Sequence, residues 1–205
     1  MSSNRVIEFS GYRICINENV YEPGEDTEIL LDLLKINQGD KVLDMGSGSG
    51  ILGFYAIRKG AKVTFIDINP YATEATLCTL KLNNVNPEKF DIINCDLLSC
   101  LRKDVAYDVA IFNPPYLPYE EYNSWIGYSW SGGKNGIEVL LRFLNSIRAK
   151  RIYIVFSSLS DFDNLFIEIK HINYKITDKR EITIGYETIM GLELVANDKA
   201  HRRGT

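Results

Sequence analysis

Metal-binding residue patterns are scarce in this chain. The 205 residues include two histidines and four cysteines, and no two cysteines form a C-x-x-C pair. Because structural and catalytic metal sites usually need such spacings, we expect no metal site. We expect the cysteines to be reduced and buried, as in a cytosolic protein. They are Cys15, Cys78, Cys95 and Cys100.

Long apolar runs and an excess of basic residues are also missing. No run approaches the ~18 apolar residues of a membrane-spanning helix, and no signal peptide opens the chain, so we expect a cytoplasmic protein. Lys and Arg number 23 against 27 Asp and Glu, a net charge of −4. This balance argues against a protein whose affinity comes mainly from neutralising phosphates, although a local basic patch would not change the total.

Length and composition predict a single catalytic domain. Apolar residues make up 45% and charged residues 24% of the chain, which are ordinary globular values. We expect one α/β domain over residues 1–195, with an N-terminal hairpin and helix in 1–38, and a polar, disordered tail over 196–205. Strand and helix patterns alternate, which predicts a mainly parallel sheet covered on both faces, with an antiparallel hairpin at 174–195.

The most informative stretch follows an apolar strand pattern at residues 108–112. It reads Asn113-Pro114-Pro115-Tyr116. Neither proline can donate to a strand ladder, and a residue before proline avoids the helical region, so the chain is held extended at the strand end. The Asn113 carbonyl and a neighbouring backbone carbonyl then form a pair of acceptors. They fit a planar –NH2 group, against which Tyr116 can lie flat.

A second motif predicts a ligand held close to the backbone. An apolar strand pattern ends in Asp44 and is followed by Gly46, Gly48 and Gly50 at alternate positions. Glycines allow a tight turn and a close approach of backbone to ligand. The next strand pattern ends in Asp67, where a carboxylate can accept both hydroxyls of a ribose.

The same glycines have a competing interpretation. Residues 48–53 also satisfy G-x-G-x-x-G, the fingerprint of dinucleotide-binding proteins. Asp44 argues against it because a carboxylate there would repel a pyrophosphate, and the Asn-Pro-Pro-Tyr element has no role in hydride transfer. A bare glycine-rich turn would need two acids, three spaced glycines and two strand patterns to coincide. In parallel sheets, ligands bind beyond the carboxyl ends of strands. The side chains at such ends are Asp44, Asp67, Asp96 and Asn113.

The combination resembles the HemK-like protein N5-glutamine methyltransferases, most of all the short archaeal and eukaryotic branch that modifies class I translation release factors. Residues 21–27 resemble its Y-x-P-x-E-D-T element, residues 44–50 its D-x-G-x-G-x-G, residues 113–116 its N-P-P-Y, and residues 130–136 its later glycine-rich loop. The resemblance implies a Rossmann-like class I methyltransferase fold with a mainly parallel seven-stranded sheet and S-adenosylmethionine as cofactor. We expect no counterpart of the helical N-terminal domain of the bacterial members.

The resemblance also implies residue roles, each with an alternative. Asp44 would meet the amino end of the cofactor directly or through water, Asp67 the ribose, and Asp96 with Leu97 the adenine; each acid could instead cap a helix. Thr27 would bind the cofactor carboxylate, or it could instead cap a helix. Asp26 is considered only as an alternative cap of that helix. The remaining cofactor contacts would be Tyr21, Gly46, Gly48, Gly50 and Asn113, and the substrate and catalytic contacts Asn113, Pro114, Pro115 and Tyr116. Trp125 and Trp130 would shape the substrate mouth or simply lie in a surface loop.

The reaction that the resemblance implies is methylation of the glutamine amide nitrogen in a Gly-Gly-Gln loop. Two alternatives from other classes remain open. Asn-Pro-Pro-Tyr fits equally well an exocyclic amine of a flipped nucleic-acid base, such as adenine N6. The fold could also serve a non-catalytic scaffold. The acidic balance and the absence of a separate recognition domain count against the first, and retention of both motifs counts against the second.

A partner is expected as well. The resemblance implies a small zinc-binding activator subunit that forms a heterodimer with this chain. In the methyltransferase strand order, residues 90–95 would form one edge of the sheet. That segment has no proline and little charge, and an apolar edge of this kind invites pairing with another chain. Its own loops could instead shield it.

Overall fold

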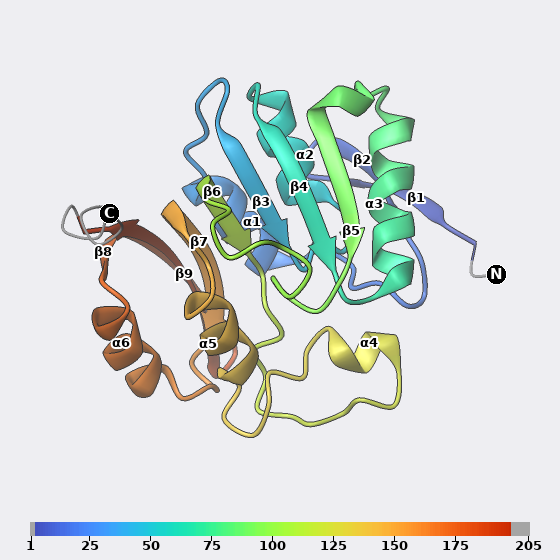
Figure 1. Ribbon diagram of the computed structural model, residues 1–205. Helices are drawn as coiled ribbons and strands as arrows, with labels where there is room; N and C mark the ends of the chain where they lie inside the picture. Colours follow the sequence, from blue (N-terminus) through green and yellow to red (C-terminus); the bar gives the residue numbers. More distant parts are fainter. Residues whose placement is uncertain (1–2, 198–205) are drawn as a thin grey trace.

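A seven-stranded sheet forms the centre of the computed structural model, which describes residues 3–197 (Figure 1). The strand order is β5-β4-β3-β6-β7-β9-β8, with the first five strands parallel and β9 antiparallel to β7 and β8. This confirms the expected fold class. The strands are β3 (Lys41–Met45), β4 (Lys62–Asp67), β5 (Phe90–Asn94), β6 (Tyr107–Phe112), β7 (Ala149–Ser157), β8 (Tyr174–Ile184) and β9 (Glu187–Ala196).

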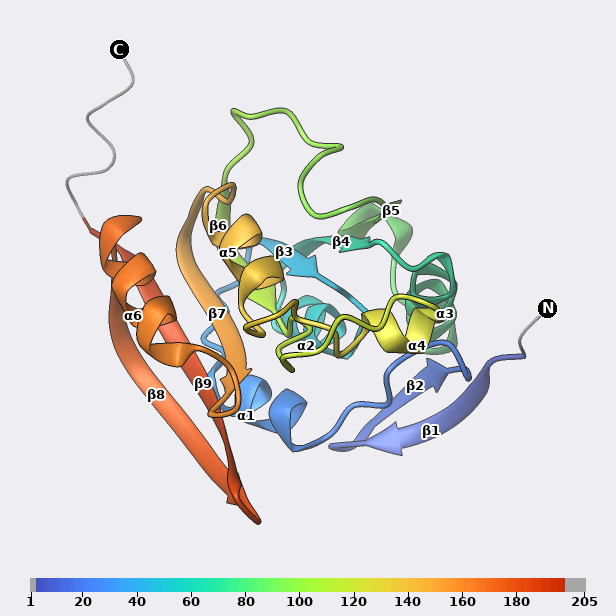
Figure 2. The same ribbon diagram turned by 90° about the horizontal axis from the view of Figure 1, so that it is seen from below.

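Helices cover both faces of the sheet (Figure 2). One face carries α1 (Glu25–Leu33), α2 (Ile51–Arg58) and α3 (Pro70–Leu82), and the other carries α5 (Glu138–Leu144) and α6 (Phe162–His171). Each face has its own apolar core, represented by Leu30 and Phe65 on the first and by Phe143 and Ile154 on the second. The central strands are buried on both faces, which explains their nearly continuous apolar sequences. Within residues 3–197, no helix is both long and apolar enough to cross a membrane.

The strand order leaves a crevice at one end of the sheet. From β3 the chain winds to β4 and β5 on one side, and from β6 to β7 on the other, so the connections after β3 and β6 diverge. Met45 at the end of β3 pairs with Ile66 of β4 and with Phe112 of β6. The residues that follow these three strand ends, including Gly46 and Asn113, therefore begin side by side.

Several local details were not predicted from the sequence. Helix α1 begins at Glu25 after Gly24, so Asp26 and Thr27 lie in its first turn and are not its cap. The loop after Tyr116 contains a short helix, α4 (Trp125–Tyr128), and a 3-10 turn, η1 (Pro87–Lys89), precedes β5. Ala196 is the last residue of β9, so the expected tail begins inside the sheet, and residues 198–205 lie outside the described part of the chain.

The N-terminal hairpin is a separate ribbon packed on α3. It consists of β1 (Arg5–Phe9) and β2 (Tyr12–Ile16), which turn through Ser10 and Gly11 at φ values of 47° and 78°. The Cys15 N–H donates to Thr79 Oγ1 at 2.9 Å, and Asn83 Nδ2 donates to the Arg13 carbonyl at 2.8 Å. The hairpin leads directly into residues 17–23, so its position on α3 also places the start of the cavity wall described below.

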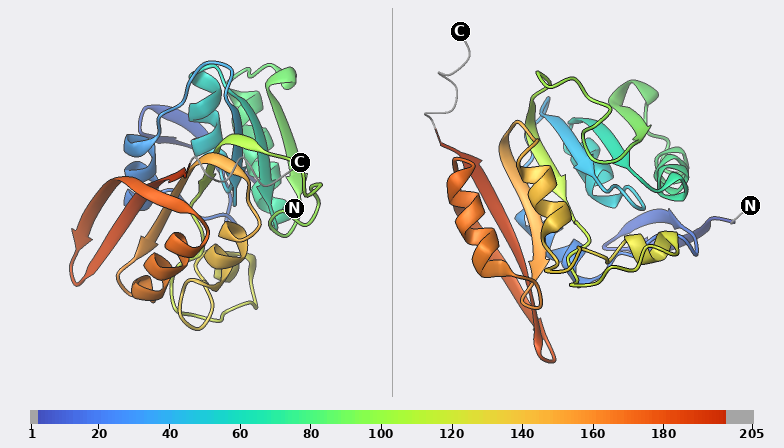
Figure 3. Two further views of the ribbon diagram at one scale, coloured as in Figure 1. Left: turned by 60° about the vertical axis from the view of Figure 1, so that its left-hand side comes forward. Right: turned by 60° about the horizontal axis from the view of Figure 1, so that its bottom comes forward.

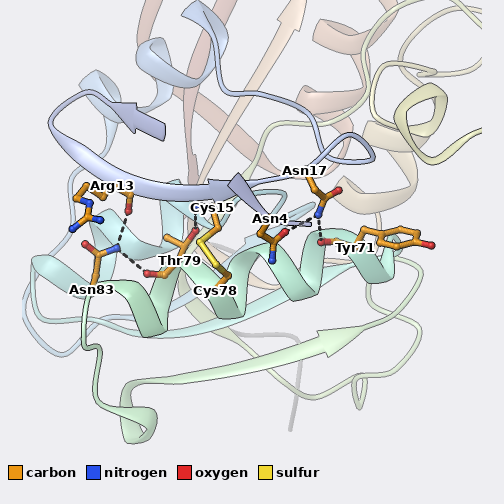
Figure 4. The surroundings of a disulfide bond; sticks show 8 residues. All are labelled: Asn4, Arg13, Cys15, Asn17, Tyr71, Cys78, Thr79 and Asn83. Atoms are coloured by element: carbon orange, nitrogen blue, oxygen red, sulfur yellow. Dashed lines mark hydrogen bonds between the residues drawn. A yellow bond between two sulfur atoms is a disulfide. The ribbon is translucent and has the colours of Figure 1, made fainter. Parts of the chain in front are cut away.

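A disulfide fastens this hairpin to α3 (Figure 4). Cys15 of β2 and Cys78 of α3 are bonded, with their Cα atoms 5.8 Å apart. Of the two free cysteines, Cys95 is half-buried and Cys100 is exposed. The expectation of four reduced, buried cysteines is therefore wrong. The reason is tertiary, because β2 crosses α3 and brings together two residues that are 63 positions apart.

We expect reduction of the Cys15–Cys78 disulfide to lower the free energy of unfolding by about 2–4 kcal/mol, because the bond closes a long loop in the unfolded chain. Urea unfolding with and without a phosphine reductant measures the difference. A Cys15→Ala/Cys78→Ala variant should be weakened to a similar degree and be insensitive to the reductant, whereas Cys95→Ala/Cys100→Ala should behave like the parent. Equal midpoints for the parent under both conditions would contradict a stabilising role.

Candidate active site

A cavity of about 620 Å³ lies beyond the carboxyl ends of β3, β4 and β6. This volume falls within the ~300–1,000 Å³ typical of small-molecule sites. Its walls come from residues 20–27, the glycine turn, the strand ends, the 117–131 segment and the beginning of β9. The right-hand view of Figure 3 shows the 117–135 segment, with α4, in front of these strand ends. Of the sequence-predicted contacts, all but Asp44 and Gly50 line the cavity: Tyr21, Thr27, Gly46, Gly48, Asp67, Asp96, Leu97, Asn113, Pro114, Pro115, Tyr116, Trp125 and Trp130.

The glycine turn after β3 requires conformations that other residues rarely adopt. Gly46, Gly48 and Gly50 have φ values of 62°, 54° and 79°. The Gly46 N–H donates to the Ile66 carbonyl at 2.7 Å, which ties the turn to β4. Gly50 is the N-cap of α2 and therefore lies behind the cavity wall. The backbone of residues 46–49 therefore lines the cavity, and no side chain at Gly46 or Gly48 separates it from a ligand.

Asp67 joins the glycine turn to the end of β4. Its Oδ2 accepts the Gly48 N–H at 2.9 Å and its Oδ1 accepts the Asn69 N–H at 2.8 Å. Burial raises the pKa of this carboxyl to about 6, and the same two hydrogen bonds act against the rise. Two carboxylate oxygens offer about four acceptor positions, so Asp67, which lines the cavity, retains acceptor capacity beyond these two bonds.

Asp44 lies beneath the glycine turn. Its Oδ2 accepts the Gly53 N–H of α2 at 2.8 Å, and the side chain is only 1% exposed. Burial raises the pKa of the Asp44 carboxyl to about 8; the Gly53 bond lowers it, and the charge of Asp67 raises it further. The structure thus shows a buried carboxyl group that connects β3 to α2. A direct contact of Asp44 with a ligand in the cavity is not part of this geometry.

Asn113 and Tyr116 meet a carboxylate that the sequence analysis considered only as a helix cap. Asp26 Oδ2 accepts hydrogen bonds from Asn113 Nδ2 at 3.0 Å, from the Tyr116 hydroxyl at 3.1 Å and from the Tyr21 hydroxyl at 3.2 Å. Thr27, expected at the cofactor, is buried in the same cluster. The sequence pattern does indicate that Asp26 is buried, because it lies at helical spacing from the apolar residues Ile29, Leu30 and Leu33 of α1.

Burial and the nearby Asp26 charge raise the pKa values of Tyr21 and Tyr116 well above the ordinary tyrosine value. Both hydroxyls therefore remain neutral donors at physiological pH. The two rings line the cavity from different elements, one from the segment before α1 and one from the segment after β6. Asp26 thus connects two aromatic walls as well as the Asn113 amide.

The glycine-rich residues 132–136 pack against the backbone of the Asn-Pro-Pro-Tyr element. The Gly132 N–H donates to the Leu117 carbonyl at 2.9 Å. A Cβ atom on Gly132 would lie 2.7 Å from the Pro115 carbonyl oxygen, and one on Gly136 would lie 2.5 Å from the Tyr116 carbonyl oxygen. Only glycine allows such an approach, so this loop supports the extended backbone that presents Asn113.

The remaining predicted residues form the outer wall. Asp96 accepts a hydrogen bond from Arg142 Nη2 at 2.7 Å, and Leu97 beside it adopts a φ of 47°. The charged residues that line the cavity are Asp26, Asp67, Asp96, Glu187 and Arg142. Since the arginine is paired with Asp96, the cavity favours a cationic ligand and disfavours a pyrophosphate. This electrostatic balance argues against the dinucleotide interpretation of the glycines.

Comparisons with known proteins agree with this geometry. Residues 13–126 match the family model "Methyltransferase small domain". A putative protein N5-glutamine methyltransferase of Methanocaldococcus jannaschii is 33% identical over 90% of this chain and 96% of its own length. Human methyltransferase HEMK2 is 39% identical over 61% of this chain, and the match spans 63% of the human protein.

Among solved structures, a chain of the E. cuniculi Mtq2–Trm112 complex superposes with a TM-score of 0.67 at 25% identity, covering 87% of this chain and 99% of that one. The E. cuniculi complex is responsible for methylation of the eRF1 translation termination factor. The M. jannaschii relative and the E. cuniculi chain therefore each match most of this chain.

The raised pKa values of the buried Asp44 and Asp67 carboxyls predict that the stability of the fold depends on pH. Their pKa values in the folded chain lie above the ordinary value of an aspartate, so the folded state holds more protons than the unfolded state between pH 4 and about 8. Stability should therefore fall as the pH rises through this range. In Asp44→Asn, which keeps an acceptor for the Gly53 N–H, the decline should be shallower. Urea unfolding at pH 4.5, 6 and 8 measures it, with the exposed Glu28→Gln as control; identical slopes in all three proteins would refute the assignment.

Proposed function

This chain belongs to the family of protein N5-glutamine methyltransferases, and from this premise we propose that it methylates a glutamine side-chain amide of a translation release factor, using S-adenosylmethionine. The observation that carries the proposal is the position of the Asn113 amide at the border of a cavity suited to a cationic ligand. The cofactor supplies an electrophilic methyl group on a positively charged sulfur.

The residues around the cavity fit that cofactor. Asp67 retains acceptor capacity for two ribose hydroxyls, and the glycine turn allows the ligand to lie against the backbone of residues 46–49. Leu97, with the paired Asp96 and Arg142 beside it, would border the adenine. The excess of carboxylates favours the sulfonium and ammonium charges. Asp44, which bonds Gly53, would act through the turn or through water.

Asn113 and the adjoining backbone would hold the substrate amide. Two carbonyl oxygens accept the two hydrogens of the –NH2 group, while the Tyr116 ring lies against its plane. Pro114 and Pro115 keep the backbone extended because they fix φ and cannot join a ladder. Residues 132–136 support the same backbone from behind through the close approach of Gly132 and Gly136.

Two carbonyl acceptors around the substrate nitrogen would help to overcome its low nucleophilicity. An amide nitrogen is a poor nucleophile because its lone pair is delocalised, with a rotation barrier of ~18–20 kcal/mol. As the methyl group arrives, the nitrogen becomes tetrahedral and positive, so its hydrogens bind the two acceptors more strongly than before. Alignment of nitrogen, methyl and sulfur contributes on the order of 7–11 kcal/mol. The proton can leave to water after transfer, and no basic side chain is needed.

The substrate class follows from the relatives. Fission yeast mtq2 is named an eRF1 methyltransferase catalytic subunit, and it is 32% identical over 64% of this chain. We therefore infer that the glutamine lies in the Gly-Gly-Gln loop of a class I release factor. The long segment 117–135 and the first residues of β9 surround the mouth and would contact that loop.

Two substitutions separate the roles of the two halves of the site. Asn113→Ala should nearly abolish methyl transfer yet leave cofactor affinity within a few fold, because the lost acceptor faces the substrate. Asp67→Ala should weaken cofactor binding by ~1.5–3 kcal/mol, because two hydroxyls lose a charged acceptor. Titration calorimetry measures affinity, and intact-mass analysis of the release factor measures transfer. Normal turnover by folded Asn113→Ala would refute the amide clamp.

The substrate provides its own control. Replacing the target glutamine by glutamate removes the amide, so the mass of the release factor should no longer increase by one methyl group. Short adenine-containing oligonucleotides, offered at the same concentration, test the exocyclic-amine alternative. If they are methylated faster than the release factor, the protein-substrate proposal fails.

We also propose that a small zinc-binding activator subunit binds at the free edge of β5. The E. cuniculi structure, in which Mtq2 is in complex with Trm112, supports a partner subunit. Asp91 and Asn94 are exposed on this strand, while Ile92 and Ile93 are half-buried among the two opposite cores. The Cys95 N–H donates to the Asp67 carbonyl of β4. Since backbone groups alternate in direction along a strand, the Ile92 N–H faces away from β4, where another strand can use it.

The edge can be tested by removing that N–H. We expect the parent chain and a Trm112-type activator to form a one-to-one complex, and the isolated chain to be poorly soluble or weakly active. Ile92→Pro should prevent the complex, whereas Ile92→Ala, which loses the side chain but keeps the N–H, should retain most of it. Light scattering of the mixtures gives the stoichiometry. A soluble, monomeric, fully active chain that ignores the activator would refute the partner proposal.

A further inference from the structure

The Asp26 carboxylate is the most connected acceptor of the site. It is 2% exposed and accepts five hydrogen bonds. Three reach Oδ2 from Asn113, Tyr116 and Tyr21, and two reach Oδ1 from the Thr27 N–H at 2.6 Å and the Thr27 hydroxyl at 3.1 Å. A buried charge is tolerated when it is bonded so completely, so it needs no cationic partner.

We infer that Asp26 is a positioning residue of the amide clamp, holding the Asn113 side chain by its nitrogen so that its carbonyl oxygen faces the substrate. The inference rests on the proposed function for the identity of that substrate. An amide presents two donors on its nitrogen and an acceptor on its oxygen. A carboxylate can receive only the nitrogen end, so the orientation of the Asn113 amide follows from the chemistry of Asp26.

The contacts of Asn113 agree with this orientation. Its Nδ2 is 3.0 Å from Asp26 Oδ2 and 3.4 Å from Thr27 Oγ1. Within residues 3–197, no donor is hydrogen-bonded to its Oδ1. The amide is therefore bound at one end and available at the other. Without the carboxylate, rotation about the terminal bond would let either end point into the cavity, and the nitrogen end would repel the hydrogens of a substrate amide.

The negative charge adds an electronic effect. Hydrogen bonds in a chain polarise one another, so donation from Nδ2 to a carboxylate makes Oδ1 a stronger acceptor. The substrate nitrogen becomes positive during transfer and lies at the other end of this chain of hydrogen bonds. The Asp26 carboxylate also accepts the Tyr116 hydroxyl. Asp26 therefore positions both the Asn113 amide and the Tyr116 ring of the clamp.

A role confined to stability is the competing explanation, because an acid in the first turn of a helix is favourable in itself. Glu25 provides the matched control. It precedes Asp26 in the same first turn, is exposed, and carries the same charge. Asp26→Asn and Glu25→Gln therefore remove one negative charge each from neighbouring positions of α1, and only the first touches Asn113.

Single-turnover methyl transfer and calorimetry on the full chain, with its activator where required, test the inference. Asp26→Asn should lower the rate by about 100-fold, the scale of a small misplacement at a reacting centre. Its cofactor affinity should fall by a much smaller factor than the rate, because Asp26 is only one of the carboxylates that line the cavity and holds the expected cofactor contacts Tyr21 and Thr27 from behind. Glu25→Gln should retain the parent rate. In an Asn113→Ala background, Asp26→Asn should cause little additional loss, because residues that act through one another are not additive.

Nuclear magnetic resonance gives a readout independent of turnover. The Asn113 side-chain N–H2 signals, identified by their loss in Asn113→Ala, should move and exchange faster with solvent in Asp26→Asn. A folded Asp26→Asn protein with the parent rate, or an equal rate loss in both backgrounds, overturns the inference. If the parent chain methylates no glutamine but does methylate another planar amine, the proposed function fails, and the same variants test Asp26 on that amine.

Discussion

The parallel register of β3 with β4 and β6 is the constraint on which the site depends. It places the ends of three strands side by side and sends the following segments in different directions. The glycine turn and Asn113 follow directly after β3 and β6, and Asp67 is the last residue of β4, so their relative positions follow from strand pairing. Sheet packing on two apolar cores therefore supports the rigidity that aligned group transfer requires.

Three buried aspartates near these strand ends have different tasks because their surroundings differ. Asp44 receives one backbone N–H and is otherwise desolvated, which makes it a structural connection between β3 and α2. Asp67 receives two backbone N–H groups yet borders the cavity, so it can serve the turn and a ligand together. Asp26 is bonded mainly by side chains of the site itself. Residue type alone does not distinguish these roles, whereas the bonded partners do.

Local periodicity and motifs at strand ends predicted the mainly parallel sheet and the polar side chains at its strand ends. The strand order and the other residues around the cavity were expected from the resemblance to the family. The sequence did not predict the Cys15–Cys78 bond, since the crossing of β2 over α3 joins segments whose spacing carries no signal. The place of Asp26 was missed for another reason. An acid near a helix start was interpreted as a cap, although its spacing from Leu30 put it on the buried face. The placement of Asp44 under the turn likewise depends on tertiary contacts with Gly53.

The proposed clamp of carbonyl acceptors would recognise the geometry of a planar amine and not the group that carries it. Such a clamp would not by itself distinguish a glutamine amide from another conjugated –NH2. Discrimination must come from surfaces that meet the rest of the substrate. In this chain those surfaces are the 117–135 segment, which returns to the clamp through the Leu117–Ser131 bridge, and the beginning of β9 with Glu187. Both segments border the cavity next to Asn113 and Tyr116. Substitutions in them can therefore alter substrate choice without moving the strand ends, the glycine turn or Asn113.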